Sequence, residues 1–525
     1  MSFKPDRRGY FSLEYIGTQE LHVMERSDLR VNRRNEHCFG FALQENVTVT
    51  LYNKDKSKTG KVLSGEFFLI PPDCDFTLHN EAERTAPLLI IGFHCLPFQH
   101  SVTQHKPHVR TQPLLLVEEF QLYSFRMPQV RSWIQDFMSD CKKGEPALLY
   151  QLQSHLYAMA AAFMTLVQKP KELEEGLKGY VEQTRQYMLE QYHRDMDIEE
   201  LARLSGSSSS RFYQAFRRHT GLSPNKFITK IRLDASLSLL ANTREPIIDV
   251  AHSIGYADEY YFSRLFKKHM GMAPTEFAAC AQKTVASLSP VFHGDLSVLG
   301  ITSQVALKRG WSESPDKALI QLKRCQPELI LTSPISDEVY RSLSEIAPVV
   351  MLHWKRMSWK ERLLEISKHL GVTSVAERWL SYFDMKVENA RFHIRNHLGD
   401  EPVLLVRASE ERFRVFGMQR RKMKDLFYDD LQVTPPDLTR HIATMDATSL
   451  TEVAALDCDN VLFLVDKLET EAYCAQLEDR WDQLRKGRGK KHCLFIRHVD
   501  PLLYNAAVHE SLVDQTVQHF MQYKS

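Results

Sequence analysis

Two sets of side chains in the middle of the chain have the chemistry of a DNA contact surface. Phe212 and Phe216, four residues apart, would anchor one helix, and Phe262 and Phe266 would anchor another. The other faces of these helices carry hydroxyl, amide, carboxylate, ammonium and guanidinium groups, which bond to base edges and phosphates. Between residues 203 and 283 there are 12 Lys or Arg and 6 Asp or Glu, a local excess of +6. A helical bundle with a solvated basic face is the alternative interpretation.

These helices belong to an internal repeat. Ile198–Ala202 is echoed by Ile247–Ala251, and each segment is followed by a turn and a second helix. Five residues recur fifty positions later, namely Phe212, Phe216, Gly221, Pro224 and Phe227 as Phe262, Phe266, Gly271, Pro274 and Phe277. Two copies are too few for a stacked solenoid, which needs about three or more. The repeat therefore predicts two helix-turn-helix units, joined by a helix over Pro224–Ala241.

The repeat resembles the AraC/XylS family of bacterial transcription regulators over about residues 180–280, through Gly255-Tyr256, Tyr261–Lys268, Gly271 and Pro274. The resemblance implies two recognition helices that enter successive major grooves of an operator in double-stranded DNA. It implies base contacts by Ser210, Tyr213, Gln214, Glu259, Tyr260 and Arg264, and phosphate contacts by Arg217, Lys267 and Lys268. Ser207–Ser210 departs from the larger residue that many relatives carry, so the first unit is expected to read fewer bases directly. The resemblance also implies contact with RNA polymerase and is compatible with a homodimer.

Length and composition set the frame for these motifs. A chain of 525 residues with 43% hydrophobic and 25% charged residues is expected to form three or four globular domains. No run approaches about 18 apolar residues, and residues 1–8 lead into no apolar segment, so we expect a cytoplasmic protein without a membrane span. The net charge of +1 names no partner, and the nine scattered cysteines indicate reduced thiols rather than a zinc site.

The N-terminal part, residues 1–168, reads as strands followed by a helical tail. Val47–Leu51, Phe67–Ile70 and Leu88–Ile91 predict an antiparallel barrel or sandwich, with Asn53–Gly60 as a turn-rich connection. Gly65–Pro72 resembles the cupin-like arm of the same regulator family. His37, His79 and His94 lack the cupin metal-binding pattern, so no metal site is expected there. Gln168–Glu175 is interpreted as a linker to the all-α domain at 177–284.

Residues 290–525 predict an α/β domain that folds alone. Short apolar runs, expected to be parallel strands buried on both faces, alternate with helical patterns. The runs are Ser297–Gly300, Glu328–Leu331, Pro348–Leu352, Val403–Val406, Val461–Val465 and Cys493–Ile496. The longest helical interval, Trp359–Leu398, is interpreted as one helix that bridges two lobes. The predicted fold class is therefore multidomain: a β-rich cupin-like arm, an all-α double helix-turn-helix and a bilobal α/β domain.

This last region resembles the periplasmic binding proteins for ferric siderophores and cobalamin. The similarity lies in Gln326–Leu331, Ile346–Val350, Arg407, Arg412–Gly417 and Asp429–Leu431. Joined to a DNA reader, such a domain resembles cytoplasmic regulators that sense an imported ferric siderophore and activate its uptake genes, including the bacillibactin-responsive activators of bacilli. The resemblance thus implies an effector that the two lobes hold between them.

The expected effector chemistry is anionic. A ferric tris-catecholate is a compact trianion with aromatic faces, and it would be held by guanidinium and ammonium donors beside apolar walls. The candidate ligand-binding residues are His353, Lys355, Arg356, Arg407, Arg412, Arg414 and Arg420. Iron would arrive already chelated by the siderophore, so no cofactor and no protein ligands to a metal are expected.

Two alternatives remain open. The regulator could instead sense a different siderophore or cobalamin. An enzyme that transfers alkyl groups to a cysteine, as in some DNA-repair regulators, is disfavoured because the chain has no zinc-type cysteine cluster and no Pro-Cys-His-Arg acceptor motif. A P-loop and a G-x-G-x-x-G motif are also absent from the sequence, so we expect a regulator and not an enzyme.

Overall fold

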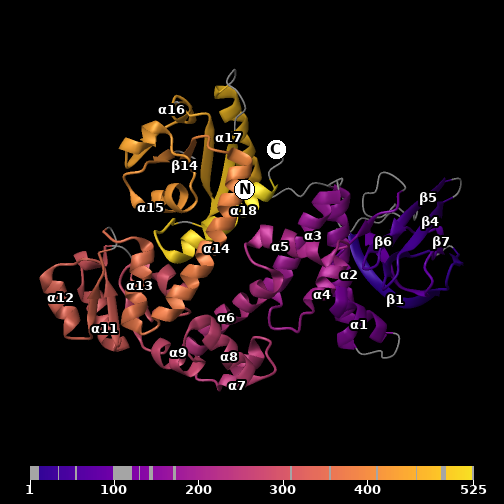
Figure 1. Ribbon diagram of the computed structural model, residues 1–525, viewed down its shortest axis with the longest axis horizontal. Coiled ribbons are helices and arrows are strands. Elements are labelled where there is room, and N and C mark those ends of the chain that lie inside the picture. The colour runs from indigo at the N-terminus through magenta and orange to yellow at the C-terminus, as the bar shows by residue number, and fades with distance from the viewer. Residues whose placement is uncertain are drawn as a thin grey trace, which may run out of the picture. The chain divides into compact units, whose positions relative to one another are not determined.

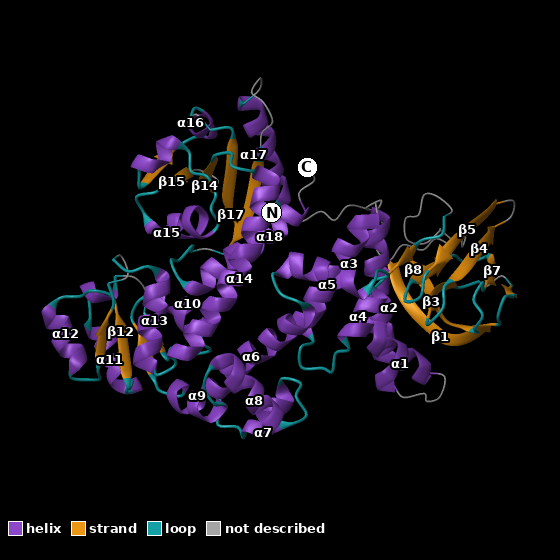
Figure 2. Cartoon of the chain, viewed as in Figure 1, coloured by secondary structure: helices purple, strands orange, loops and turns teal. Residues whose placement is uncertain are grey.

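The computed structural model (Figures 1 and 2) divides into two compact units. Unit 1 comprises residues 1–190 and 197–215, and unit 2 comprises residues 191–196 and 216–525. The division falls within helix α5 (Ser209–Thr220). The structure describes residues 11–32, 35–53, 56–97, 121–128, 130–140, 146–168, 173–307, 310–353, 356–409, 412–456, 458–485, 492–499 and 501–522.

Unit 1 contains two antiparallel sheets, with strand orders β1-β8-β3-β6-β9 and β2-β7-β4-β5, which confirms the β-rich prediction. Its strands are β1 (Phe11–Val23), β2 (Asp28–Val31), β3 (His37–Ala42), β4 (Val47–Asn53), β5 (Lys56–Val62), β6 (Phe67–Ile70), β7 (Asp75–His79), β8 (Ala86–Pro97) and β9 (Ser124–Phe125). On β4, Val47, Val49 and Leu51 are buried in the core at every second position. The prediction of a turn over Asn53–Gly60 was wrong. These polar residues largely form β5, which lies at the edge of its sheet, where exposed charged residues are favoured.

The helices of unit 1 are α1 (Val130–Asp140), α2 (Pro146–Gln168), α3 (Leu173–Glu190) and α4 (Ile198–Leu204). Helix α2 is attached to β1 through Gln153, whose side chain donates to Leu13 O at 2.6 Å and accepts from Tyr15 N at 3.0 Å. The expected linker over Gln168–Glu175 is shorter than predicted, because α3 already begins at Leu173. Residues 169–172 lie outside the described residues.

Unit 2 begins with the second half of the helical repeat. Its helices are α6 (Pro224–Asn242), α7 (Ile247–Ser253), α8 (Glu259–Met270) and α9 (Pro274–Ala281). Helix α6 corresponds to the predicted connecting helix and begins with Pro224 in its first turn, where the missing proline N–H leaves no hydrogen bond unmade. In the described part of the chain, no helix is long and apolar enough to cross a membrane.

Two α/β lobes follow (Figure 2). Lobe 1 has the parallel strand order β11-β10-β12-β13, and lobe 2 has the order β16-β15-β14-β17-β18. The elements of lobe 1 are β10 (Val285–Ser287), α10 (Pro290–Val298), β11 (Val305–Ala306), the 3-10 turn η1 (Trp311–Glu313), α11 (Asp316–Cys325), β12 (Leu329–Thr332), α12 (Asp337–Ser344), β13 (Val349–Met351) and α13 (Trp359–Leu370). After the connecting helix α14 (Thr373–Leu398), lobe 2 contains β14 (Val403–Ser409), β15 (Arg412–Phe416), α15 (Arg421–Met423), the π-helical segment η2 (Lys424–Asp430), the 3-10 segment η3 (Asp437–His441), β16 (Thr444–Ala447), α16 (Leu450–Ala454), β17 (Asn460–Asp466), α17 (Glu471–Leu484), β18 (Cys493–His498) and α18 (Ala506–Gln522).

Three predictions about this region need correction. Lobe 2 is mixed rather than parallel, because β14 and β15 are joined by a short connection that reverses the chain, whereas parallel neighbours need a long crossover. Ser297–Gly300 ends α10 and enters a turn instead of forming a strand. The starting residue 290 omits β10, which pairs with both β11 and β12.

The interval Trp359–Leu398 is two helices rather than one. Helix α13 ends at Leu370, and Gly371 takes a left-handed conformation with φ of 76°. The N–H of Gly371 donates to Lys368 O at 3.1 Å and the N–H of Val372 donates to Ser367 O at 2.9 Å, which closes the end of the helix. The glycine therefore turns the chain into α14, and α14 alone connects with lobe 2.

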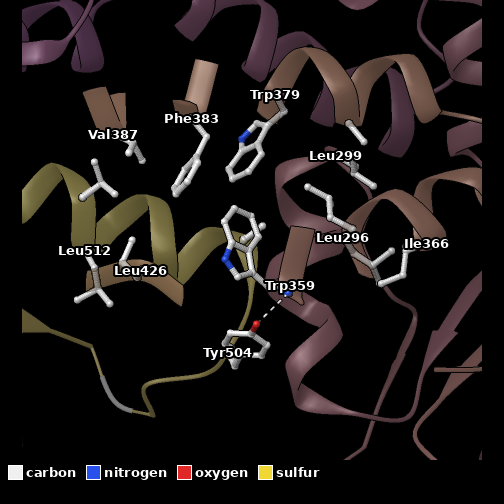
Figure 3. Packing of buried hydrophobic residues seen from close by; sticks show 14 of the residues in the cluster. Leu296, Leu299, Trp359, Ile366, Trp379, Phe383, Val387, Leu426, Tyr504 and Leu512 are labelled. Carbon is white, nitrogen blue, oxygen red and sulfur yellow. Dashed lines mark hydrogen bonds between the residues drawn. The ribbon is translucent and has the colours of Figure 1, made fainter. Parts of the chain in front are cut away.

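The largest hydrophobic cluster of unit 2 surrounds Trp359 (Figure 3). The indole of Trp359 is fully buried, with ring centroids 6.0 Å from Trp379 and 4.9 Å from Phe383, both on α14. The same cluster includes Leu233 of α6 and Phe262 of α8. The connecting helix, lobe 1 and the second helix-turn-helix unit therefore share one core.

Candidate functional site

The first helix-turn-helix unit consists of α4 and α5. Asp197 caps α4 by accepting from Glu200 N at 3.1 Å, and Leu201, Ala202 and Leu204 are buried as expected. Gly206, with φ of 70°, makes the turn. The backbone O of Leu204, just before this turn, accepts from Arg126 Nη1 at 2.6 Å, so the β-rich part of unit 1 is bonded to the turn.

On α5, Phe212 and Phe216 are fully buried, which fixes the exposed face of the helix. Ser210, Gln214 and Arg217 are exposed on it. Tyr213 is half-buried, and its hydroxyl donates to Glu199 Oε1 of α4 at 2.9 Å. The tyrosine hydroxyl is thus already engaged.

The second unit consists of α7 and α8. Gly255 makes its turn with φ of 88°, and Asp258 caps α8 by accepting from Tyr261 N at 2.6 Å. Phe262 and Phe266 are fully buried. The opposite face of the helix presents a stripe at spacings of three to four residues, formed by Tyr260, Arg264, Lys267 and Lys268. All four are exposed, with Tyr260 at 78%, and Glu259 is half-buried at the start of the helix.

The second candidate site is a pocket of about 240 Å³ in lobe 2, here named the arginine pocket. Its lining residues are Arg407, Arg414, Phe416, Arg420, Lys422, Thr444, Pro501, Leu502 and Leu503. Strand register explains part of this gathering, because Arg407 of β14 lies opposite Arg414 of β15, and Phe416 lies opposite Thr444 of β16. Four cationic side chains, one aromatic ring and two leucines thus line the same pocket.

Arg414 is held in place by Asp446. Its guanidinium donates from Nε to Oδ1 at 2.6 Å and from Nη2 to Oδ2 at 3.0 Å. These hydrogen bonds raise the pKa of Arg414 and lower the pKa of Asp446. Both groups therefore stay charged, and the two parallel hydrogen bonds fix the orientation of the guanidinium group.

The pocket gathers three of the expected ligand residues, Arg407, Arg414 and Arg420. Arg412 is exposed on the same strand but does not line it. In lobe 1, His353 is exposed, and Arg356 lines a separate groove beside α13 and α14. Lys355 lies outside the described residues. The expectation of one site lined by both lobes is therefore not met by these residues.

Sequence reasoning missed the segment Pro501–Leu503, which closes the arginine pocket. A usable signal was present, since this segment follows β18, and loops at the carboxyl ends of parallel strands commonly form binding sites. Lys422 also lines the pocket and was not among the predicted ligand residues.

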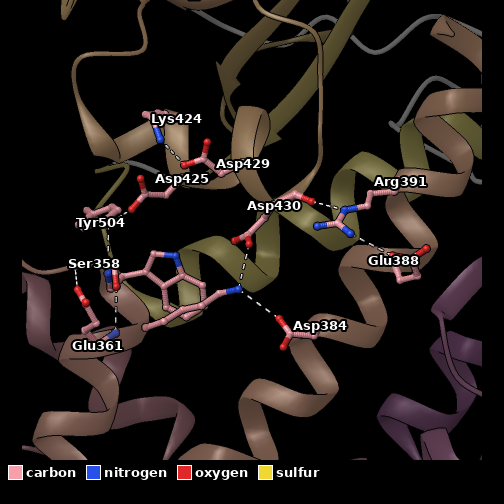
Figure 4. Close-up of polar contacts among 12 residues, drawn as sticks. Ser358, Glu361, Asp384, Glu388, Arg391, Lys424, Asp425, Asp429, Asp430 and Tyr504 are labelled. Carbon is pink, nitrogen blue, oxygen red and sulfur yellow. Dashed lines mark hydrogen bonds and ion pairs between the residues drawn. The ribbon is translucent and has the colours of Figure 1, made fainter. Parts of the chain in front are cut away.

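A larger cleft of about 540 Å³ lies where the lobes meet, and its charges are already paired (Figure 4). Lys360 Nζ of α13 lies 2.9 Å from Asp430 Oδ1 of η2 and 3.2 Å from Asp384 Oδ1 of α14. Burial raises the pKa of Asp430, although Lys360 opposes that shift. Asp425 accepts a hydrogen bond from the Tyr504 hydroxyl, and burial also raises its pKa. The lining contains four carboxylates and three cations, so this cleft is a poor receptor for an anion compared with the arginine pocket.

No arrangement for a resident metal is found in the part of the chain that the structure describes, where no three His, Cys, Asp or Glu residues are placed to hold an ion. His37 is buried on β3, and this burial lowers its pKa to about 4. His79 bonds to Asp28 on the neighbouring strand at 2.5 Å, and His94 lies on β8.

The chain is similar to known proteins in sequence and in structure. The model of a helix-turn-helix domain matches residues 201–279. The transcriptional activator Btr of Bacillus subtilis is 28% identical over 365 residues, which cover 64% of this chain and 68% of Btr. The iron(3+)-hydroxamate-binding protein FhuD of B. subtilis is 27% identical over 128 residues, 24% of this chain and 41% of FhuD. The solved FhuD structure from S. pseudintermedius covers 46% of this chain and 92% of its own, with 14% identity and a TM-score of 0.37.

Together, the helix-turn-helix units and these similarities indicate a DNA-binding transcription regulator of the helix-turn-helix class, whose chain is also similar in part to an iron(3+)-hydroxamate-binding protein. Within that class, residues 201–279 match the helix-turn-helix domain model, and the chain is similar to the activator Btr.

Proposed function

We propose that this regulator binds a ferric siderophore in its C-terminal domain and, in response, activates genes for siderophore uptake. The observation that carries the proposal is the arginine pocket, in a domain of the siderophore-binding type joined to a DNA reader. The similarity to a protein named as a transcriptional activator supports activation, which requires contact with RNA polymerase.

For the DNA side, we assign base contacts to Ser210, Tyr213, Gln214, Glu259, Tyr260 and Arg264. Phosphate contacts are assigned to Arg217, Lys267 and Lys268. The exposed stripe of α8 supports this division, because Arg264 stands in the middle of the helix, whereas Lys267 and Lys268 lie in its last turn.

For the effector, we favour a ferric catecholate. Four cationic side chains in a small pocket attract a trianion more strongly than a neutral ferric hydroxamate, because the Coulomb attraction depends on the charge of the ligand. A hydroxamate is the second candidate, because a relative of this chain is named for binding iron(3+)-hydroxamate. The two ligand classes differ in formal charge, so the same binding experiment separates them.

Calorimetric titration of the full chain tests the proposal. We expect tight binding of a ferric tris-catecholate and weaker binding of a neutral ferric tris-hydroxamate. Replacing Arg407→Gln and Arg420→Gln together should weaken catecholate binding at least tenfold, about 1.4 kcal/mol.

The matched control is Arg412→Gln, which changes an exposed arginine of the same lobe that does not line the pocket. This variant should bind the catecholate as the wild type does. Equal affinity of the wild type for the catecholate and the hydroxamate would refute the charge argument. Absence of binding to either complex would refute the siderophore proposal.

A further inference from the structure

We infer that helix α14, which connects the two lobes, is also the element that passes the effector signal to the DNA-reading helices, through a buried ion-pair joint. The joint consists of Lys230 and Asp234 of α6, Lys386 of α14, and Glu510 and Asp514 of α18. The nature of the signal rests on the proposed function, whereas the joint itself rests on the contacts of unit 2.

Glu510 is at the centre of the joint. Its Oε1 lies 2.8 Å from Lys386 Nζ and 3.5 Å from Lys230 Nζ. Each lysine has a second partner, since Lys386 bonds to Asp514 at 2.9 Å and Lys230 bonds to Asp234 at 2.6 Å. One carboxylate thereby ties the helix between the two DNA-reading units to the helix between the two lobes.

Burial makes this joint sensitive to the loss of a partner. Lys230 and Lys386 are only 8% and 9% exposed, so each ammonium group depends on its carboxylates for solvation. Although burial opposes ionisation, the two lysines hold the pKa of Glu510 at about 2. Glu510 therefore stays charged at neutral pH, and a shift of α14 or α18 that separated it from the two lysines would leave buried charges unpaired.

Helix α14 also contacts the C-terminal end of each recognition helix. Near its start, Ser374 lies against the turn at Gly271 that ends α8, where a Cβ atom would come within 2.7 Å of Ser374 Cβ. One turn before the joint, Tyr382 Oη is 2.9 Å from Nδ1 of His269 in the last turn of α8.

The other contact lies one turn beyond the joint. Asn389 Nδ2 donates to Arg218 O in the last turn of α5 at 2.9 Å, and His393 Nε2 is 2.7 Å from the same oxygen. With these contacts in place, Arg217 of α5 and Arg264, Lys267 and Lys268 of α8 remain exposed. Helix α14 is also bonded to the two lobes. Lys360 of α13 bonds to Asp384 of α14 and to Asp430 of η2, and Arg391 of α14 donates to the backbone oxygen of Asp430.

The contact geometry thus gives α14 two roles in one rigid element. Its bonds to lobe 1 and η2 depend on the relative position of the two lobes. Its contacts with α5, α8 and the joint hold the helices proposed to read DNA. A ligand that favours one lobe arrangement will change operator affinity to the extent that these contacts differ between the two states.

The test measures coupling in the full chain rather than binding alone. Operator DNA is first selected from a random library with the wild-type protein, and its affinity is measured with and without a ferric tris-catecholate. The coupling is the ratio of the two affinities. We expect Lys386→Gln and, independently, Asn389→Ala to bring this ratio at least threefold closer to one, with the affinity for the ferric complex unchanged.

Lys323→Gln is the matched control, because Lys323 is exposed on α11 of the same domain. It should leave the ratio at the wild-type value. Asn389→Ala removes one exposed hydrogen bond to α5 without unpairing a buried charge, so it tests the role of α14 in the coupling even where Lys386→Gln unfolds the chain. A wild-type ratio in folded Asn389→Ala and Lys386→Gln would overturn the inference.

A second readout needs no effector and separates this inference from the proposed function. Operator DNA should slow amide hydrogen exchange in α14 and α18 of the wild type, and slow it less in Asn389→Ala. Unchanged exchange in both helices on adding DNA would overturn the joint, even for a protein that binds a siderophore. Slowed exchange without siderophore binding would support the joint and refute only the identity of the effector.

Discussion

The exposed stripe of α8 carries two kinds of cation, and they should act differently on DNA. Arg264 can bond to O6 and N7 of a guanine, whereas Lys267 in the last turn is placed for a phosphate. We expect Arg264→Ala to cost about 1–3 kcal/mol of operator binding and to relax base preference at one position. Lys267→Ala should weaken binding to all sequences alike and reduce the salt slope by about one.

Selection from a random DNA library, followed by a salt titration, measures both effects. If Arg264→Ala selects the same bases as the wild type, Arg264 does not read a base. A loss of sequence preference in Lys267→Ala would assign base readout to that lysine instead.

A buried histidine in α18 predicts a specific pH dependence of stability. The ring of His509 is tilted against Trp359 and edge-on to Tyr504, at centroid distances of 4.9 and 5.3 Å, and burial lowers its pKa to about 3. An unfolded histidine has a pKa of about 6.5, so below that pH the unfolded chain binds a proton that the folded chain does not. Stability is therefore complete above pH 6.5 and decreases as the pH falls. Between pH 7.5 and 5.5 this residue should account for about 1.4 kcal/mol of lost stability.

Urea unfolding of His509→Phe checks this loss of stability, because phenylalanine keeps an aromatic ring at the position but cannot take up a proton. The variant should lose about 1.4 kcal/mol less than the wild type between the two pH values. His441→Gln, at an exposed position, is the control and should follow the wild type. An equal loss in His509→Phe and wild type would mean that His509 does not set the pH dependence.

At the scale of elements, the short strand β10 marks the start of the C-terminal α/β domain. Its three residues, Val285–Ser287, lie in the interior of the lobe 1 sheet and pair with strands on both sides. A fragment of residues 290–525 lacks this strand and leaves the pairing edges of β11 and β12 unmade. We therefore expect a fragment of residues 283–525 to unfold at higher urea concentration than one of residues 290–525. The same midpoint for both fragments would show that β10 contributes nothing to lobe 1.

Elements with a clear periodicity were predictable from the sequence, while those that depend on tertiary pairing were not. The repeat identified both helix-turn-helix units because the buried Phe212, Phe216, Phe262 and Phe266 recur at a fixed spacing. Strand β10 was missed because three residues are too few for a periodic signal. The break at Gly371 was overlooked because the helical pattern continues on both sides of it.

The arginine pocket was also predictable only in part, because its lining depends on tertiary pairing. The basic character of residues 407–422 was visible in the sequence, but only strand register places Arg407 beside Arg414 and leaves Arg412 outside the pocket. The apolar wall at Pro501–Leu503 is about eighty residues further along the chain and enters through a loop after the last strand. Composition therefore predicts the charge of such a site, but not which of several arginines form it.

At the scale of the whole molecule, effector binding and DNA binding are expected to be linked. The two α/β lobes and the second helix-turn-helix unit share a hydrophobic core. Because a packed core resists deformation, a change in the arrangement of the lobes should alter the packing of the helix-turn-helix unit. Linkage then requires that the effector change operator affinity by the same factor as the operator changes effector affinity.

The most direct test of the regulator as a siderophore sensor is its operator affinity at saturating ferric tris-catecholate, compared with its affinity alone. Because allosteric coupling is typically about 5–150-fold, we predict a change of about tenfold in the wild type. In the Arg407→Gln, Arg420→Gln variant the same concentration of ferric complex should have a much smaller effect, with operator affinity in its absence unchanged. An operator affinity that is the same with and without the bound ferric complex in the wild type would contradict the account.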